Sequence, residues 1–206
     1  MTVLQANDPS AIQGGFANPV FDAQAVFRQV MEAIARPGKI AAIENLTEPP
    51  APLTPVTGAI AATLFDHDTQ IWLDPVLARS SDVAGWLAFN TAAPIVREML
   101  DADFAVISDS EALPSLESFS QGTQEYPDRS TTLIVQIAAL SGGPGLTLTG
   151  PGIQEIAHIV PQGLPDRFMD QWSANGMRFP RGVDVLLAAP EGVIALPRTV
   201  KIKRGR

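Results

Sequence analysis

Residues 14–38 (GGFANPVFDAQAVFRQVMEAIARPG) constrain the fold of this chain most, because a helix start, an apolar stripe and a helix stop follow one another there. Asp22 is the predicted N-cap, since its carboxylate can accept hydrogen bonds from the free N–H groups of a first turn. Phe21 before it can pack on Val26 as a hydrophobic staple, and Pro37-Gly38 ends the helix. The apolar side chains predicted to share one face are Val26, Phe27, Val30, Met31 and Ile34. The stretch is therefore predicted to form an amphipathic helix.

Beyond this helix, predicted helices and strands alternate in the first half of the chain, and strands pair locally in the second half. Helices are predicted at residues 55–65, with Thr54 as N-cap, and at 81–90, 113–119 and 164–176. Strands are predicted at residues 39–44, 69–74, 103–108, 131–140, 146–150, 183–190 and 192–199. The glycine turn SGGPG is expected to join 131–140 to 146–150, and Pro190-Glu191-Gly192 is expected to make a hairpin of the last two strands. This pattern predicts an α/β fold, a three-layer α/β/α arrangement with a mixed sheet and helices on both faces.

Composition excludes several classes of protein. The formal net charge is −8, and four of the 14 basic residues lie in the last six positions, so residues 1–200 carry ten basic against 22 acidic residues, a charge of −12. Nucleic acid is therefore not an expected partner. The absence of cysteine excludes disulfides and any thiolate-held cluster or zinc, and no apolar run reaches the roughly 20 residues that a membrane helix needs. We expect one domain over residues 1–206, with a short basic C-terminal tail at 201–206, in a cytoplasmic protein.

Six further segments, together with the Asp-Ala-Gln, Phe-Arg and Pro-Gly run of the first helix, carry a family resemblance. They are DHDTQIWL (66–73), FNTAAP (89–94), GTQEYPDRSTTLIVQIAALSGG (122–143), LTLTGPGI (146–153), FPRGVDVLL (179–187) and LPRT (196–199). In this order the chain resembles the PhnH family, the H subunits of the bacterial carbon–phosphorus lyase system. Asn90 stands where the resemblance leads us to expect a histidine in many relatives, which argues against a general base at this position.

The resemblance implies both a fold and a function. The implied fold is similar to the large domain of pyridoxal-phosphate-dependent transferases, but without the cofactor. The implied function is that of a subunit of the carbon–phosphorus lyase core complex, which with the G, I and J subunits forms ribose 1-phosphonate 5-triphosphate from ATP and a phosphonate by displacing adenine. In this scheme the J subunit later cleaves the carbon–phosphorus bond by radical chemistry. Intrinsic activity of this chain alone is not expected, and a nucleotide or phosphonate is a candidate ligand.

The lysines of the chain bear on the cofactor. A pyridoxal-phosphate enzyme needs a desolvated lysine amine for its internal aldimine, and the three lysines here are Lys39, Lys201 and Lys203. Two lie in the tail and Lys39 opens a strand, so we predict that no Schiff base forms and that the chain has no cofactor. We also expect a homodimer, because Trp72, Trp86 and Trp172 and many alanines and prolines are more apolar surface than one modest core needs.

The Asp66-His67-Asp68 run is the densest cluster of titratable groups. Two carboxylates beside an imidazole suit acid–base chemistry or a hard cation. The favoured interpretation is a turn in which the Asp side chains accept from local N–H groups, since no further ligand recurs nearby and no metal site is expected. His158, the other histidine, is expected to be partly buried and structural.

Three other groups are candidates for binding an anion or a partner. Thr123 and Glu125 precede a buried strand and offer a hydroxyl and a carboxylate, although a solvent-facing loop would have the same sequence. Arg198 has a planar guanidinium suited to phosphate, phosphonate or a partner's carboxylate, and Arg28 and Arg36 are expected to face a partner or solvent. The SGGPG and LTGPG segments match no phosphate-loop pattern and are interpreted as turns. The alternative function is a free-standing enzyme that uses Asp66, Asp68, Glu125 and Arg198 around an anionic substrate.

Overall fold

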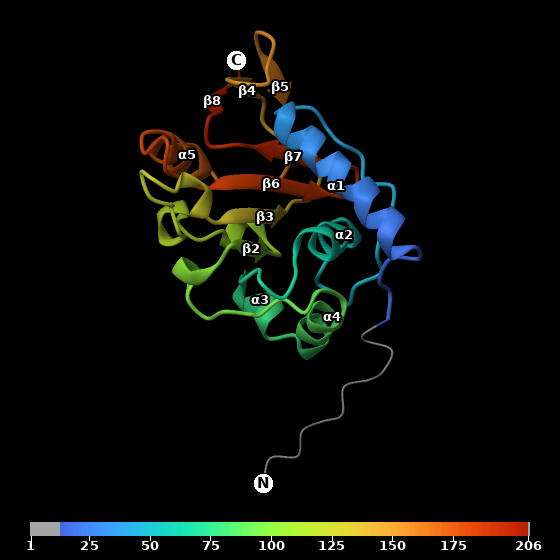
Figure 1. Cartoon of the computed structure of the whole chain (residues 1–206). Helices are drawn as coiled ribbons and strands as arrows, with labels where there is room; N and C mark the ends of the chain where they lie inside the picture. Colours follow the sequence, from blue (N-terminus) through green and yellow to red (C-terminus); the bar gives the residue numbers. More distant parts are fainter. Residues whose placement is uncertain (1–12, 206) are drawn as a thin grey trace.

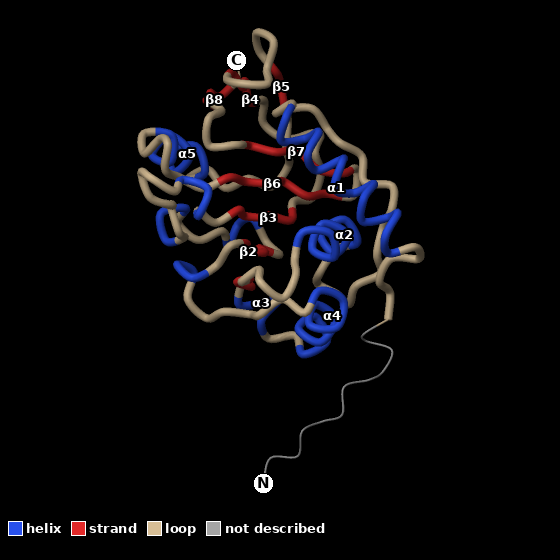
Figure 2. The backbone as a smooth tube through the Cα atoms, viewed as in Figure 1, coloured by secondary structure: helices blue, strands red, loops and turns tan. Residues whose placement is uncertain are grey.

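A computed structural model describes residues 13–205 of the chain as a mixed α/β fold with two β-sheets (Figures 1 and 2). The helices are α1 (Pro19–Ala35), α2 (Pro55–Leu64), α3 (Pro75–Ala78), α4 (Ser81–Thr91) and α5 (Phe168–Gly176). The strands are β1 (Ile71–Leu73), β2 (Phe104–Ile107), β3 (Thr132–Gln136), β4 (Leu146–Thr149), β5 (Ala157–Ile159), β6 (Asp184–Ala189), β7 (Gly192–Leu196) and β8 (Lys201–Arg204). Short 3-10 turns are η2 (Met99–Asp101), η3 (Ser110–Ala112), η4 (Leu116–Ser118) and η5 (Pro127–Arg129). None of the helices in the described part combines the length and apolarity of a membrane span.

The larger sheet has the strand order β1-β2-β3-β6-β7. Its first four strands are parallel, and β7 returns antiparallel to β6 through the Ala189↔Gly192 hairpin, as the Pro190-Glu191-Gly192 turn predicts. The mixed sheet is therefore confirmed. Because β1, β2, β3 and β6 run the same way, their amino ends meet at one edge of the sheet and their carboxyl ends at the other.

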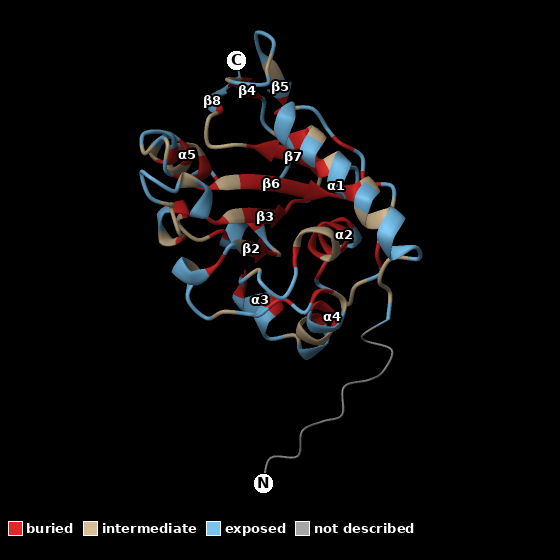
Figure 3. Ribbon diagram, viewed as in Figure 1, coloured by how far each residue is buried: buried red, intermediate tan, exposed pale blue. Residues whose placement is uncertain are grey.

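Two apolar cores cover the two faces of this sheet. Along β6, Leu186 and Ala188 pack with α1, α2 and α4, whereas Val185 and Leu187 pack with α5 and the smaller sheet, as the period of two in a strand requires. Figure 3 shows the strands of this sheet buried between the helices. Each fully buried Leu or Val stabilises the fold by about 1.5–3 kcal/mol relative to its exposed state, so the two cores stabilise the sheet from both faces.

The smaller sheet corrects two sequence expectations. It is antiparallel with the order β5-β4-β8, so residues 146–149 pair with β5 and β8 and do not form a hairpin with β3, which lies between β2 and β6. The segment expected to be a basic tail contains strand β8, which pairs Lys201 with Thr149. Arg206 of that segment lies outside the described residues.

The first helix also departs from expectation. It begins earlier than predicted, with Asn18 as N-cap and Pro19 at the first helical position, because Asp22 accepts a hydrogen bond back from the Asn18 N–H (2.7 Å). Phe21 therefore lies inside the helix and is exposed, so the predicted staple is wrong. The apolar stripe is divided. Its buried members are Val26 and Val30, joined by Ala33, and its exposed members are Phe27, Met31 and Ile34.

Local signals elsewhere are mostly correct. Thr54 caps α2 by accepting from the Thr57 N–H, and Pro55 begins the helix, both as predicted. Residues 39–44 are not a strand, since only Ala41 forms a bridge, to Val193 on the edge of the sheet. The segment 113–119 contains a 3-10 turn where a helix was expected. The three tryptophans are buried and belong to the core, so they give no support to a homodimer: Trp72, Trp86 and Trp172.

Candidate functional site

At the carboxyl edge of the parallel strands, the polar groups are occupied by the protein itself. Asp74, which follows β1, is 1% exposed. Its Oδ1 accepts from the N–H groups of Val76 (3.0 Å) and Leu77 (2.8 Å) at the start of α3. Its Oδ2 accepts from the N–H (2.7 Å) and the hydroxyl (2.6 Å) of Ser108, which follows β2. Four hydrogen bonds leave this carboxylate no evident capacity for a ligand.

Gln136 closes the same edge at the end of β3. Its Oε1 accepts from the Thr54 N–H (2.8 Å), and its Nε2 donates to the carbonyls of Pro52 (3.0 Å) and Ser108 (3.4 Å). The loop that leads into α2 is therefore held over the strand ends. Open α/β sheets usually bind ligands outside the carboxyl ends of their strands, but the groups that lie there in this protein bind one another.

At the amino edge, Arg198 joins three segments that are distant in sequence. Its guanidinium donates to both carboxylate oxygens of Asp184 at the start of β6, to the Pro127 carbonyl (2.6 Å) and to the Ser130 hydroxyl (2.6 Å). The Arg198 backbone N–H also donates to Asp184 Oδ1 (2.6 Å). The Arg198 side chain is only 14% exposed. Arg198 therefore binds groups of its own chain, and nearly all of the N–H donors of its guanidinium are already used, which leaves little capacity for an external anion.

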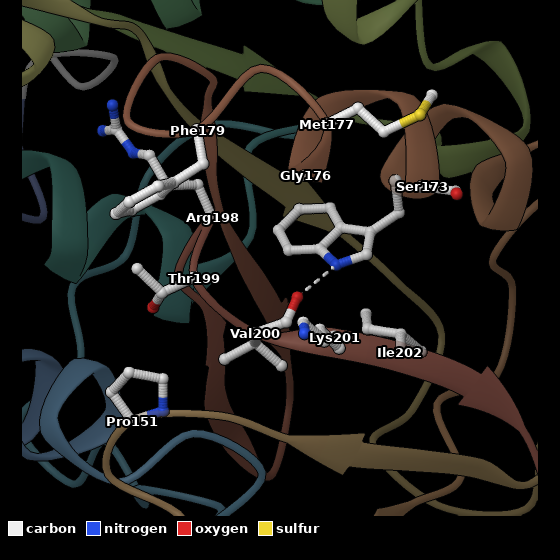
Figure 4. Close-up of a pocket in the computed structure, with 11 residues that line it drawn as sticks. Pro151, Ser173, Gly176, Met177, Phe179, Arg198, Thr199, Val200, Lys201 and Ile202 are labelled. Carbon is white, nitrogen blue, oxygen red and sulfur yellow. Dashed lines mark hydrogen bonds between the residues drawn. The ribbon is translucent and has the colours of Figure 1, made fainter.

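Beside Arg198 lies a cavity of about 600 Å³ between α5 and the segment that enters β8 (Figure 4). Trp172 is part of its lining, and its indole Nε1–H donates to the Val200 carbonyl (2.9 Å) while its ring stacks on Phe168. Met177 and Phe179 flank the cavity and are 80% and 63% exposed. Its full lining is Pro151, Trp172, Ser173, Gly176, Met177, Phe179, Arg198, Thr199, Val200, Lys201 and Ile202. The cavity has the size of a binding site and mostly apolar walls.

Polar groups of the cavity stand at its margin. Lys201 is exposed, and among the described residues it makes no ion pair, unlike Arg204, which pairs with Asp166 (3.3 Å). Ser173 and Thr199 add hydroxyls for which no hydrogen bond is found within residues 13–205. The margin therefore carries one unneutralised cation and two available hydroxyls around an apolar floor.

The Asp66-His67-Asp68 run is an exposed turn between α2 and β1. Asp66 Oδ1 accepts from the Asp68 N–H (3.0 Å) and the Thr69 hydroxyl (2.7 Å). The Thr69 hydroxyl and then the Asp68 N–H hold the pKa of Asp66 below its usual value. His67 Nε2 lies 3.3 Å from Asp68 Oδ2 in solvent. No group of three or more His, Asp or Glu side chains in the described part of the chain could hold a metal ion. The geometry is that of the favoured turn interpretation.

The remaining predicted site residues lie apart. Thr123 and Glu125 are exposed in the loop before β3, where the Thr123 hydroxyl accepts from the Tyr126 N–H (3.0 Å). Asn90 lies on α4 and donates to the Trp86 carbonyl (2.9 Å). His158 is exposed on β5, so its expected partial burial is wrong.

Between residues 13 and 205, no hydrogen bond or ion pair joins the turn with Asp66 and Asp68, Glu125 and Arg198 to one another, and Arg198 is paired with Asp184 instead. What the structure brings together is a set of segments. LTLTGPGI supplies Pro151, FPRGVDVLL supplies Phe179 and Asp184, LPRT supplies Arg198, and the segment from 122 to 143 supplies Pro127 and Ser130.

Sequence reasoning missed Trp172, Met177, Phe179 and Lys201 as members of one site. The sequence did offer one indication: four of the segments that carry the family resemblance supply residues of this region, so they could be expected to lie close together in the fold. Their meeting point is set by the order of strands, which no local pattern reveals.

Comparisons with known proteins agree across almost the whole chain. The family model described as "Bacterial phosphonate metabolism protein (PhnH)" matches residues 14–203. The α-D-ribose 1-methylphosphonate 5-triphosphate synthase subunit PhnH of Rhizobium meliloti (strain 1021) is 50% identical over 191 residues, which are 93% of this chain and 95% of that protein. A putative C-P lyase subunit protein, HtxG of Stutzerimonas stutzeri, is 32% identical over 179 residues, 87% of this chain and 85% of its own length.

Proposed function

Since this chain belongs to the PhnH family of bacterial phosphonate metabolism proteins, we propose that it is a subunit of α-D-ribose 1-methylphosphonate 5-triphosphate synthase in a carbon–phosphorus lyase pathway. The observation that carries the proposal is the 50% identity to a subunit of that name over 93% of the chain. The putative C-P lyase subunit that matches at 32% identity supports the same pathway. The chain acts in the cytoplasm with the G, I and J subunits, and the transfer of a phosphonate to the ribose of ATP belongs to the assembled synthase.

The geometry supports an accessory role for this chain. The guanidinium of Arg198 is bound internally, the acidic turn is satisfied locally, and the polar groups at the carboxyl edge bind one another. Arg198 therefore contributes to assembly by fixing the loop that carries Thr123 and Glu125, with these two exposed side chains as candidate partner contacts. Asp66, Asp68 and Asn90 contribute no chemistry to the reaction.

The same proposal includes a fold similar to the large domain of pyridoxal-phosphate-dependent transferases, but without the cofactor. The support is the run of four parallel strands with an antiparallel neighbour, and the exposure of all three lysines. Lys39, for example, lies in solvent and pairs with Glu32 (3.1 Å). A desolvated amine, which an aldimine requires, is not offered by any of them.

We also propose that the free chain forms a homodimer. The support is the exposed apolar row on α1, which includes Phe27, Met31 and Ile34. Light scattering of the purified chain at micromolar concentrations gives twice the chain mass under this proposal. A monomer at all concentrations would contradict it.

Reconstitution of the synthase tests the proposed function. Cells that lack the gene for this chain are expected to stop growing on methylphosphonate as the source of phosphorus and to recover when the chain is supplied. In extracts, the conversion of ATP and methylphosphonate to ribose 1-methylphosphonate 5-triphosphate with release of adenine requires this chain together with the other subunits. Product formed at the full rate without this chain would contradict the proposal.

A further inference from the structure

The cavity beside α5 adjoins an unpaired strand edge. In the smaller sheet β8 pairs with β4 on one side and is the last strand of the sheet, with no strand on its other side among the described residues. In Figure 4 Ser173 and Met177 lie on the α5 side of the cavity, and Lys201 and Ile202 lie on the β8 side. A groove between an edge strand and a helix is the geometry in which a peptide adds as a further strand, with backbone hydrogen bonds along the edge and side chains in the groove.

The floor of the groove is built to receive apolar side chains. Trp172 and Ile202 form part of it, and Gly176 opens it, because a methyl group added at Gly176 would meet no atom within 4 Å. At the margin, Met177 and Phe179 remain largely exposed. A small molecule seated on the floor would leave these two side chains in water, whereas a polypeptide that runs along the groove covers them.

The charge beside the groove indicates the chemistry of the occupant. Lys201 and Lys203 alternate with Ile202 along β8, so they lie on the face of the strand opposite Ile202, Lys201 in the lining of the groove and Lys203 next to it, and neither makes an ion pair among residues 13–205. They form a local positive strip on a chain whose formal charge is −8. Lysines on a strand edge also discourage pairing with a neutral or basic strand. An acidic segment is therefore the complementary partner, and a second copy of β8 is disfavoured by like charge.

We infer that the groove between α5 and the free edge of β8 is a docking site for an extended acidic and apolar segment of another subunit of the synthase. The segment lies alongside β8, places apolar side chains over Trp172 and Gly176, and places carboxylates beside Lys201 and Lys203. The identity of the partner rests on the proposed function, whereas the groove, the strand edge and the charge are features of this chain alone.

Two substitutions with matched controls test the docking site. Gly176→Glu places a carboxylate in the open groove, and its control Gly176→Ala adds a methyl group to the same empty space. Lys201→Glu reverses the charge at the strand edge, and its control Arg79→Glu makes the same change of charge at the exposed end of α3. Circular dichroism and urea unfolding establish that all four variants are folded before binding is measured.

Binding is measured by titration of the full chain into the co-purified G, I and J subunits. We expect Gly176→Glu and Lys201→Glu each to raise the Kd about tenfold or more, and the two controls to leave it within about twofold. Raising the salt concentration from about 0.1 M to about 0.5 M is expected to weaken binding by the wild type more than binding by Lys201→Glu. The reason is that salt screens the attraction between Lys201 and a carboxylate of the partner, which the variant lacks.

Each other outcome overturns a defined part of the account. Wild-type affinity in both groove variants would overturn the docking site and leave the proposed function intact. Failure of the wild-type chain to bind the three subunits would overturn the proposed function and this inference together. Self-association of the isolated chain that is abolished by Gly176→Glu would identify a second copy as the occupant and would overturn the assignment to another subunit.

Discussion

The two edges of the larger sheet differ in how their polar groups are used. At the carboxyl edge, Asp74, Ser108 and Gln136 bind one another and the loop before α2, so the edge is filled. At the amino edge, Arg198 makes a similar internal network, but a cavity remains beside it, flanked by Met177 and Phe179 in solvent. The comparison teaches that the usual ligand edge of an α/β sheet serves stability in this protein, while the opposite edge retains surface for a partner.

Loss of the carboxylate at the closed edge gives the largest expected effect. Asp74→Ala removes the cap of α3 and leaves the partly buried N–H and hydroxyl of Ser108 unpaired, which is expected to lower the free energy of unfolding by about 3 kcal/mol. Urea unfolding measures the change. Asp82→Ala, at an exposed acid in the first turn of α4, is the control and is expected to stay within about 0.5 kcal/mol. Equal changes in the free energy of unfolding for the two substitutions would show that Asp74 contributes no more to stability than an exposed acid, and would contradict the description of the carboxyl edge as closed.

The guanidinium at the amino edge gives the second effect. Arg198→Lys keeps the charge but cannot reach Asp184, Pro127 and Ser130 at once, so the free energy of unfolding is expected to fall by about 2 kcal/mol. A double-mutant cycle with Asp184→Asn should show strong coupling between the two residues. Unchanged stability together with lost anion binding would instead make Arg198 a ligand residue, as the sequence first suggests.

The open groove gives a smaller effect of opposite sign. Gly176→Ala is expected to raise the free energy of unfolding by about 0.5 kcal/mol, because alanine favours the helical backbone and its methyl group meets no atom. Thermal unfolding detects the rise in Tm. A loss of stability would mean that other atoms of the protein occupy the space beside Gly176 in solution. The amino edge would then be closed, as the carboxyl edge is.

The acidic turn gives the smallest effect. The pKa of Asp66 is lowered from 3.8 by the Thr69 hydroxyl and the Asp68 N–H, so its contribution to stability is present above that pKa and is lost as pH falls through the lower folded value. Stability of Asp66→Asn should therefore approach that of the wild type in acid, and the carboxyl resonance of Asp66 should titrate at a pH below the ordinary value of an aspartate. His67→Asn should leave stability and growth on methylphosphonate almost unchanged. A titration midpoint raised above the ordinary value of an aspartate would contradict the hydrogen bonds of the turn.

Sequence alone predicts the features that depend on neighbours along the chain. Thr54 with Pro55 marks the start of α2, and Pro190-Glu191-Gly192 marks the last hairpin, because caps and tight turns need only a few adjacent residues. The predicted hairpin at SGGPG is wrong because a glycine turn fixes a reversal and not the strand to which the chain returns. Residues 39–44 have a strand-like pattern, but a single bridge to β7 is all that the edge provides.

The site was less predictable than the fold for the same reason. Asp184 is the partner that converts Arg198 from a candidate anion ligand into an internal contact, and it meets Arg198 only because β6 and β7 pair. Asp74 and Ser108 likewise meet through the parallel pairing of β1 with β2. The resemblance supplied the family correctly, but residue roles at both edges depend on strand order and burial.

Hydrogen exchange of the full chain, free and in complex with the G, I and J subunits, tests the contrast between the edges most directly. Backbone amides at 172–179 and 199–204 are expected to exchange more slowly in the complex, because the partner strand covers the groove and pairs with β8. Amides at 74–77 and at Ser108 are expected to exchange at the same rate in both states, since their partners are already internal. New protection at 74–77 and Ser108, with no change at 172–179 and 199–204, would contradict the account.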